Sequence, residues 1–132
     1  MKTSNYEQNI INLLRRNRIA FEREKTFSDL KGGKFRYDFY LPALNVLIEV
    51  DGEQHFHQVK HFQKTRRDFL KQQEHDRRKN SYALARGITL IRIPYWEIEN
   101  ITVLADLFQD KFIVESRWHS DFLVPPRGRS QI

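Results

Sequence analysis

The chain has 132 residues, and its 23 Lys and Arg residues against 17 Asp and Glu residues give a formal charge of +6. A pI near 9.7 is typical of domains that bind nucleic acid, although basic charge alone identifies no function. The absence of cysteine excludes disulfides and thiolate-bound metals. No apolar run approaches the roughly 20 residues of a membrane span. Because the N-terminus also lacks the apolar core of a signal peptide, we expect a cytoplasmic protein with no membrane partner.

The first predicted element is a helix over residues 4–16. Glu7, Ile10 and Ile11 follow the i, i+3, i+4 spacing of one helical face, so Glu7 falls on or beside the inward stripe. Ser4 and Glu7 also match a capping box, in which the glutamate folds back onto the Ser4 amide. The structural and the functional explanation of Glu7 are compatible.

Three strands are predicted next. Residues 19–27 are typical of an edge strand, and a turn that contains two glycines follows them. The stretches 35–41 and 46–51 alternate side chains with the period of a strand, and Pro and Asn residues break the chain between them. Strands this apolar are usually buried on both faces. In the second stretch the alternation turns Glu49 and Asp51 to the same face.

Three carboxylates lie within these apolar strands, namely Asp38, Glu49 and Asp51. Buried carboxylates repel one another and lose hydration unless a cation compensates them. Hard oxygen ligands suit Mg²⁺ or Mn²⁺, so we expect a divalent ion on Asp38 and Glu49. The carbonyl of Val50 is a further candidate ligand, and Asp51 is another. The alternative is a plain buried ion pair between Asp38 and one of two arginines, Arg36 or Arg92.

A second helix is predicted over residues 65–86, ended by Gly87 just past its last turn. Phe69, Asp76 and Ala83 are seven residues apart and share a face, so Asp76 is expected to point inward. The alternative is that Asp76 pairs with neighbouring basic residues on a solvated surface, where most charged helical residues lie.

An apolar run over residues 88–93 is typical of a central strand, and a short last helix is expected to end near Phe108. The order is helix, three strands, helix, strand, helix. This order predicts an α/β fold with one mixed sheet of about four strands flanked by helices. The helical crossover should make the last strand parallel to its neighbour. We expect a single domain over residues 1–115 and a C-terminal arm over residues 116–132.

Residues 37–39 (YDF) followed by residues 48–51 (IEVD) resemble the PD-(D/E)xK nuclease pattern, with Tyr in place of Pro and Asp in place of Lys. The longer stretch 47–55 (LIEVDGEQH) is similar to one branch of that superfamily. This branch includes the very-short-patch mismatch-repair endonucleases and the phage homing endonucleases with a Glu-Asp-x-His-Asp active site. The resemblance covers roughly residues 4–97. It implies a restriction-endonuclease-like core, dependence on a divalent metal and cleavage of DNA.

The resemblance assigns catalytic roles by position to Glu7, Asp38, Glu49, His55 and Asp76. Glu7 matches a helical glutamate beside the metal site, Asp38 the main metal-binding aspartate, and Glu49 the second acid of the motif. His55 matches the family histidine, which acts as general base or general acid. Asp76 matches the final helical aspartate.

Two features leave alternatives open. Asp51 stands where the superfamily has a catalytic lysine and cannot itself stabilise a developing negative charge, which favours an inactive module that binds nucleic acid. His57 and His61 compete with His55 for the proton-transfer role, and the three histidines make a zinc site a further alternative.

Basic residues just before and within the second helix are expected to contact DNA phosphates without reading sequence: Lys60, Lys64, Arg66, Arg67, Lys71, Arg77, Arg78 and Lys79. The sequence thus predicts a metal-dependent DNA endonuclease that makes nicks or double-strand breaks, with a homodimer as one arrangement. A nuclease acting on RNA or on branched DNA is the other alternative. The resemblance also implies a phage or mobile-element origin and a location in the cytoplasm of the host cell.

Overall fold

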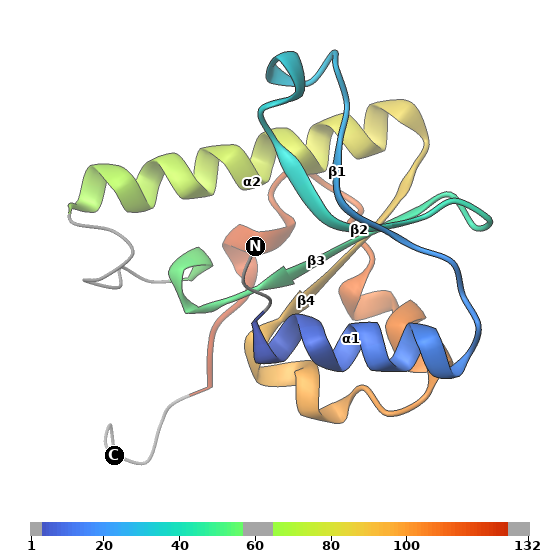
Figure 1. Ribbon diagram of the computed structural model, residues 1–132. Coiled ribbons are helices and arrows are strands. Elements are labelled where there is room, and N and C mark those ends of the chain that lie inside the picture. The colour runs from blue at the N-terminus through green and yellow to red at the C-terminus, as the bar shows by residue number, and fades with distance from the viewer. Residues whose placement is uncertain (1–3, 57–64, 127–132) are drawn as a thin grey trace.

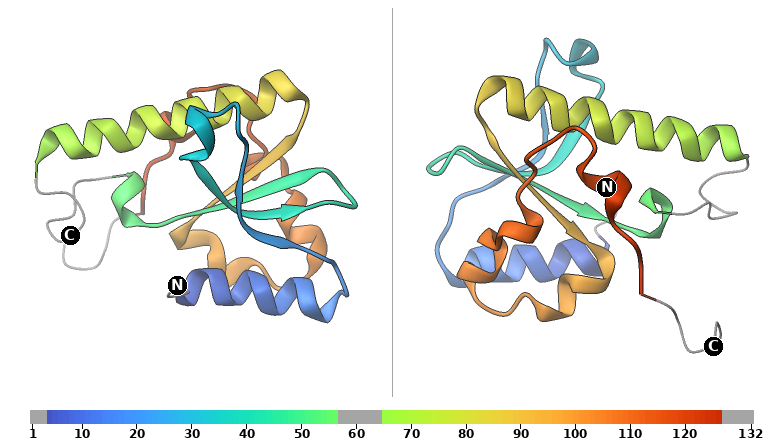
Figure 2. Two further views of the ribbon diagram at one scale, coloured as in Figure 1. Left: turned by 45° about the horizontal axis from the view of Figure 1, so that its top comes forward. Right: turned by 180° about the vertical axis from the view of Figure 1, so that it is seen from behind.

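In the computed structural model, which describes residues 4–56 and 65–126, two helices lie on opposite sides of a four-stranded sheet (Figures 1 and 2). The helices and strands follow the predicted order as far as the last strand: α1 (Asn5–Arg16), β1 (Glu22–Thr26), β2 (Arg36–Leu41), β3 (Val46–Asp51), α2 (Arg66–Arg86) and β4 (Thr89–Pro94). The predicted fold class, α/β with a mixed sheet of about four strands between helices, is confirmed.

The strands lie in the order β1-β2-β3-β4. Pairing is antiparallel from β1 to β3 and parallel between β3 and β4, as predicted for two strands joined by a helical crossover. The parallel register sets Glu49 of β3 opposite Arg92 of β4. The sheet therefore brings residues from two distant parts of the chain to the same place.

Both helices begin, and α2 ends, where local sequence signals predict. Ser4 Oγ accepts a hydrogen bond from the Glu7 amide at 3.1 Å, and Thr65 Oγ1 accepts one from the Asp68 amide at 3.2 Å. Each hydroxyl satisfies an amide that the first turn of a helix leaves without a partner. α2 ends at Gly87, whose φ of 67° lies in the left-handed region that glycine adopts without strain.

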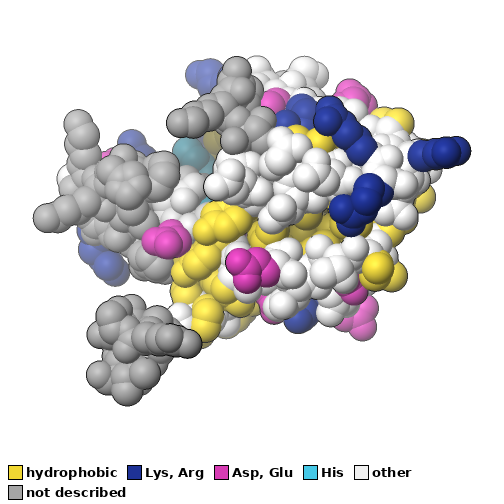
Figure 3. Space-filling view, turned by 60° about the horizontal axis from the view of Figure 1, so that its bottom comes forward, with side chains coloured by type: hydrophobic (Ala, Val, Ile, Leu, Met, Phe, Trp, Pro, Cys, Tyr) yellow, Lys and Arg dark blue, Asp and Glu magenta, His cyan; other side chains and the backbone are white. Residues whose placement is uncertain are grey.

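The side chains of β3 alternate between two hydrophobic clusters, one on each face of the sheet. Val46, Ile48 and Val50 join the cluster that contains the apolar stripe of α1. Leu47 joins a smaller cluster that contains Ala83 of α2. Seen from outside, the α1 side of the molecule carries a band of hydrophobic side chains, with Lys and Arg side chains toward one end (Figure 3).

A short helix ends at Phe108, as predicted, but it is a 3₁₀ helix and not an α-helix. The chain after β4 forms short 3₁₀ helices: η3 (Tyr95–Asn100), η4 (Leu104–Phe108), η5 (Asp110–Phe112) and η6 (His119–Phe122). These segments are too short for a stable α-helix, and 3₁₀ turns are the usual form of such short pieces. The repeated turns bring Ile98, Leu107 and Phe112 into the α1-side cluster.

Residues 116–126, the described part of the predicted C-terminal arm, include η6, which packs on α2. Ser120 is buried there, and Arg77 Nε donates to Asp121 Oδ2 at 2.9 Å. Among the described helices, none is both long and apolar enough to cross a membrane.

Candidate active site

Asp38 and Glu49 lie on the neighbouring strands β2 and β3. Phe39 is opposite Ile48, and the next step along this antiparallel register brings Asp38 toward Glu49. Asp38 Oδ2 accepts a hydrogen bond from the Val50 amide at 2.7 Å, which ties its carboxylate to β3. The two acids that the sequence predicts as a pair are therefore held on adjacent strands at the same level of the sheet.

The charge of Glu49 influences the ionisation of Asp38. Burial, and then the charge of Glu49, raise the pKa of Asp38 well above its usual range, against the opposing effects of the Val50 amide and Lys79. Burial also raises the pKa of Glu49, while the positive charges of Lys79 and Arg92 oppose this rise. A bound cation would stabilise the ionised forms of these two buried carboxylates.

Lys79 of α2 brings a cation to this pair. Its Nζ lies 2.5 Å from Glu49 Oε1 and also donates to the carbonyl of Arg36. The sequence predicts Lys79 only as a phosphate contact, because Asp51 occupies the motif's lysine position on β3. The available signal is that Lys79 lies three residues after Asp76, on the helical face that points inward.

His55 and Asp76 form a hydrogen-bonded pair beside the acids. Asp76 is 1% exposed, so the prediction that it points inward is confirmed and the solvated-surface alternative is wrong. His55 Nδ1 lies 2.9 Å from Asp76 Oδ2, and Gln72 Nε2 donates to Asp76 Oδ1 at 3.3 Å. These contacts connect η2 (Glu53–His55), which follows β3, to the middle of α2.

The charges around His55 set its protonation. Burial favours the neutral ring, but the negative charges of Asp51 and Asp76 outweigh burial and raise the pKa of His55 to about 9. For Asp76 burial would raise the pKa, whereas Arg92 and His55 lower it below its usual value. An ionised Asp76 accepts the hydrogen on Nδ1, which leaves the other ring nitrogen, Nε2, available for proton transfer.

Arg92 of β4 is fully buried and holds the network together. Its guanidinium contacts Asp51 Oδ1 at 2.8 Å, Asn80 Oδ1 at 2.6 Å and Asp76 Oδ1 at 3.6 Å. Arg92 therefore does not form the alternative ion pair with Asp38, because its carboxylate partners are Asp51 and Asp76. Asp51, a candidate metal ligand from the sequence, has one oxygen bound by this arginine.

Glu7 lies at the margin of the site. Glu7 Oε1 is 2.5 Å from Arg23 on β1, and Glu7 Oε2 accepts the Ser4 hydroxyl at 3.2 Å. The predicted capping box is thus present in altered form, with the hydroxyl of Ser4 rather than its amide donating to the glutamate. The charge of Glu7 contributes to the raised pKa of Asp38, so Glu7 belongs to the same electrostatic cluster.

The donor atoms of Asp38 and Glu49 suit a hard divalent ion. Each carboxylate has one oxygen engaged, by Val50 or Lys79, and the other has no hydrogen bond to any residue within 4–56 and 65–126. In that part of the chain no group of three or more His, Asp or Glu side chains is arranged to hold a metal. Mg²⁺ commonly uses one or two carboxylates and completes its shell with water and substrate phosphate, so a two-carboxylate site fits it.

The remaining predicted residues divide into three sets. Lys60 and Lys64 lie outside the described residues, as do the competing histidines His57 and His61. Four cations of α2 are exposed: Arg66, Arg67, Lys71 and Arg78. Arg77 is occupied by its ion pair with Asp121.

Comparison with known proteins adds little about activity. No family model matches the chain, and no solved structure matches it. The chain is similar to the uncharacterized protein 307L of Invertebrate iridescent virus 6, with 36% identity over 67 residues. That match covers 49% of this chain and 34% of the viral protein, so the chain spans about a third of the length of the curated relative.

Proposed function

We propose that this protein is a divalent-metal-dependent DNA endonuclease that hydrolyses phosphodiester bonds, as nicks or double-strand breaks. The observation that carries the proposal is the meeting of Asp38 and Glu49 with Lys79, next to the His55–Asp76 pair. A paired acid site, a cation and a proton-transfer group are the parts that metal-assisted phosphodiester hydrolysis needs. The resemblance of residues 37–55 to the PD-(D/E)xK nucleases supports the same function.

Asp38 and Glu49, with the carbonyl of Val50, would hold Mg²⁺ or Mn²⁺. When bound, such an ion lowers the pKa of a water molecule and stabilises negative charge on a phosphoryl oxygen. Asp51 contributes less directly to ion binding, because one of its oxygens is bound by Arg92. In the network Asp51 is the counter-ion of this arginine.

The chain's own residues supply the remaining functions. Lys79 opposes the rise in the pKa of Glu49 that burial causes, and it offers a positive charge to the phosphate that reacts. His55, held through Nδ1 by Asp76 and protonated at neutral pH, is suited to give a proton from Nε2 to the leaving oxygen. We therefore assign His55 the role of general acid rather than general base. Glu7 acts through its charge at the edge of the site.

DNA is the proposed substrate, and the exposed cations of α2 are its proposed phosphate contacts. A phage or mobile-element origin and action in the host cytoplasm are part of the same proposal, and the similarity to a viral protein fits an origin in a mobile genome. A homodimer would provide the second active site that a double-strand break requires.

The main alternative, an inactive module that binds nucleic acid, rested on the acidic residue at the lysine position of the motif. Lys79 weakens this argument for an inactive module, because α2 brings the ammonium group of Lys79 to Glu49 and so replaces the missing lysine of the motif. A nuclease that prefers RNA or branched DNA shares the same chemistry and differs only in how its substrate is held.

Incubation of supercoiled plasmid with the purified protein and Mg²⁺ or Mn²⁺ tests the proposal. We expect relaxed plasmid with the wild type, none with EDTA, and none with Asp38→Asn or Glu49→Gln. Glu99→Gln, which removes an exposed carboxylate on η3, is the matched control and should retain cleavage. A rise in melting temperature with Mn²⁺ that Asp38→Asn loses would report ion binding independently of cleavage.

Equal relaxation by the wild type and both variants would show a contaminating nuclease and would remove the enzyme proposal. Tight DNA binding by the wild type without any cleavage would leave the inactive module as the function.

A further inference from the structure

A groove runs along α2, between this helix and the segment that carries η1 (Lys31–Gly33) and the start of β2. Three adjoining hollows of about 310, 400 and 480 Å³ make up the groove. The first and second share Lys34, Phe35 and His75, and the second and third share Lys31. The hollows therefore adjoin one another along the helix.

The inner end of the groove opens at the candidate active site. Lys79 and Gln72 line the first hollow. Lys79 Nζ is bound to Glu49, and Gln72 donates to Asp76 at 3.3 Å. An extended ligand lying in the groove would thus have one end beside both the acid pair and the His55–Asp76 pair.

The groove is positively charged. Besides Lys79, which pairs with Glu49, five lining cations have no ion pair with any residue in 4–56 or 65–126: Lys31, Lys34, Arg36, Arg78 and Arg117. The two acids on its wall are already engaged, since Asp29 pairs with Arg86 and Glu74 lies 3.6 Å from Arg77.

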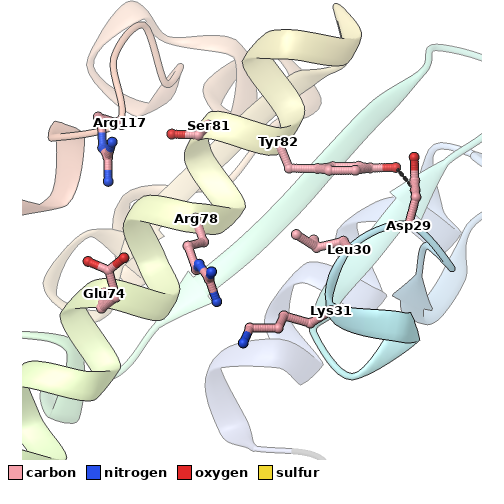
Figure 4. A pocket seen from close by; sticks show the side chains of 8 residues that line it. All are labelled: Asp29, Leu30, Lys31, Glu74, Arg78, Ser81, Tyr82 and Arg117. Carbon is pink, nitrogen blue, oxygen red and sulfur yellow. Dashed lines mark hydrogen bonds between the residues drawn. The ribbon is translucent and has the colours of Figure 1, made fainter.

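Figure 4 shows the outermost of the three hollows. Lys31 and Arg78 reach into it from opposite walls, one from η1 and the other from α2. The Tyr82 hydroxyl donates to Asp29 at 2.5 Å at the rim, which further occupies this acid. Unpaired cations on two facing walls are suited to a polyanion that passes between them.

The groove also contains an aromatic surface. The rings of Phe35 and His75 lie 4.7 Å apart at the junction of the first two hollows. Burial, together with the charges of Lys79, Arg78 and Lys31, lowers the pKa of His75 against the effect of Asp76, so the ring is neutral at neutral pH. Aromatic faces inside a basic groove are the arrangement on which single-stranded bases stack.

We propose that this groove holds a single strand of DNA that continues from the cleaved bond, so that the preferred substrate is a duplex with an unpaired extension, such as a flap or fork. The inference rests on the proposed nuclease function and adds its substrate class. Phosphates of the extension contact Lys34, Arg78 and Lys31, and its bases lie against Phe35 and His75.

Equilibrium binding in EDTA tests this proposal without cleavage. Fluorescence anisotropy would compare a blunt hairpin duplex with the same hairpin carrying a 5′ or 3′ single-stranded extension, over a range of salt concentrations. We expect the wild type to bind one extended form at least about tenfold more tightly, because each base that stacks on an aromatic face strengthens binding by about that factor.

The variant Lys34→Gln/Arg78→Gln should lose this preference and lower the slope of log Kd against log salt by about 1.4, that is, about 0.7 per lost phosphate contact. Arg15→Gln/Arg16→Gln removes the same charge from the end of α1, on the other side of the sheet, and should retain the preference. Lys34→Arg/Arg78→Lys, which keeps both charges, should also retain it. Circular dichroism of each variant checks that it is folded.

Equal affinity of the wild type for blunt and extended hairpins would overturn the groove proposal. Equal loss of the preference in the Lys34/Arg78 and Arg15/Arg16 variants would also overturn it. If plasmid is still relaxed in a metal-dependent manner, the nuclease function stands while the groove proposal fails. If the wild type neither binds these hairpins nor relaxes plasmid, both proposals fail together. Tighter binding of a matched RNA extension would reassign the strand to RNA.

Discussion

The two faces of the sheet differ in what they bury. The α1 face has 14 buried apolar residues in one cluster, whereas the α2 face has six. The buried charged groups lie on the α2 face, where Glu49 meets Lys79 and Arg92 joins Asp51 to Asp76. The same strand, β3, supplies both, because alternate side chains point to opposite faces.

This difference indicates that the two faces of the sheet have different roles. Apolar burial stabilises the fold in proportion to the area removed from water, so the larger α1-side cluster supplies most of that free energy. Buried charges are costly unless they are paired, and on the α2 face Glu49, Asp51 and Asp76 each have a cationic partner. We infer that the α1 face maintains the fold and the α2 face carries the chemistry.

The largest expected effect is on stability. Arg92→Met leaves Asp51 and Asp76 buried without their main counter-charge, and we expect the free energy of unfolding to fall by about 3–5 kcal/mol. Urea denaturation measures this change. Arg86→Met, at the exposed end of α2, should stay within about 0.5 kcal/mol of the wild type. Similar stability of the two variants would contradict a structural role for the buried network.

The variant Lys79→Met tests whether the α2 face carries the chemistry. Loss of the ammonium beside Glu49 should lower the single-turnover cleavage rate at saturating DNA by about 10²–10³-fold, the usual effect of removing one group that stabilises transition-state charge. Arg15→Met, which removes an exposed charge from α1, should leave this rate unchanged. A rate for Lys79→Met within threefold of the wild type would remove Lys79 from the mechanism.

A pH titration tests the charge network through His55. Its folded-state pKa of about 9 lies above the ordinary value of 6.5, so its contribution to stability is complete below about pH 6.5 and is lost as the pH rises through 9. One proton changes the free energy of unfolding by at most about 1.4 kcal/mol per pH unit. We expect the stability difference between the wild type and His55→Gln to shrink across this window. A constant difference would show that His55 has an ordinary pKa in the folded protein.

The smallest expected effect belongs to the α1 face. Ile48→Val removes one methylene from the larger cluster and should cost about 0.5–1.5 kcal/mol of stability, with no change in cleavage rate under conditions where the protein is folded. Thermal unfolding and the plasmid assay measure the two quantities. If the cleavage rate falls more than tenfold, the two faces are not functionally separate.

Local patterns in the sequence determined much of this arrangement. The alternation of β3, the caps at Ser4 and Thr65, the end of α2 at Gly87 and the inward position of Asp76 all follow from periods and capping rules that involve near neighbours. For the same reason the strand and helix order was predictable as far as β4.

Only the tertiary structure decided which charged groups meet. Glu49 and Lys79 are 30 residues apart, and Asp51 and Arg92 are 41 apart, so no local period relates them. Simple alternation would also place Tyr37 with Phe39, yet Tyr37 packs in the α2-side cluster and donates to the Lys79 carbonyl. Partners are chosen by how strands twist and how α2 crosses the sheet, and these depend on the packing of the whole chain.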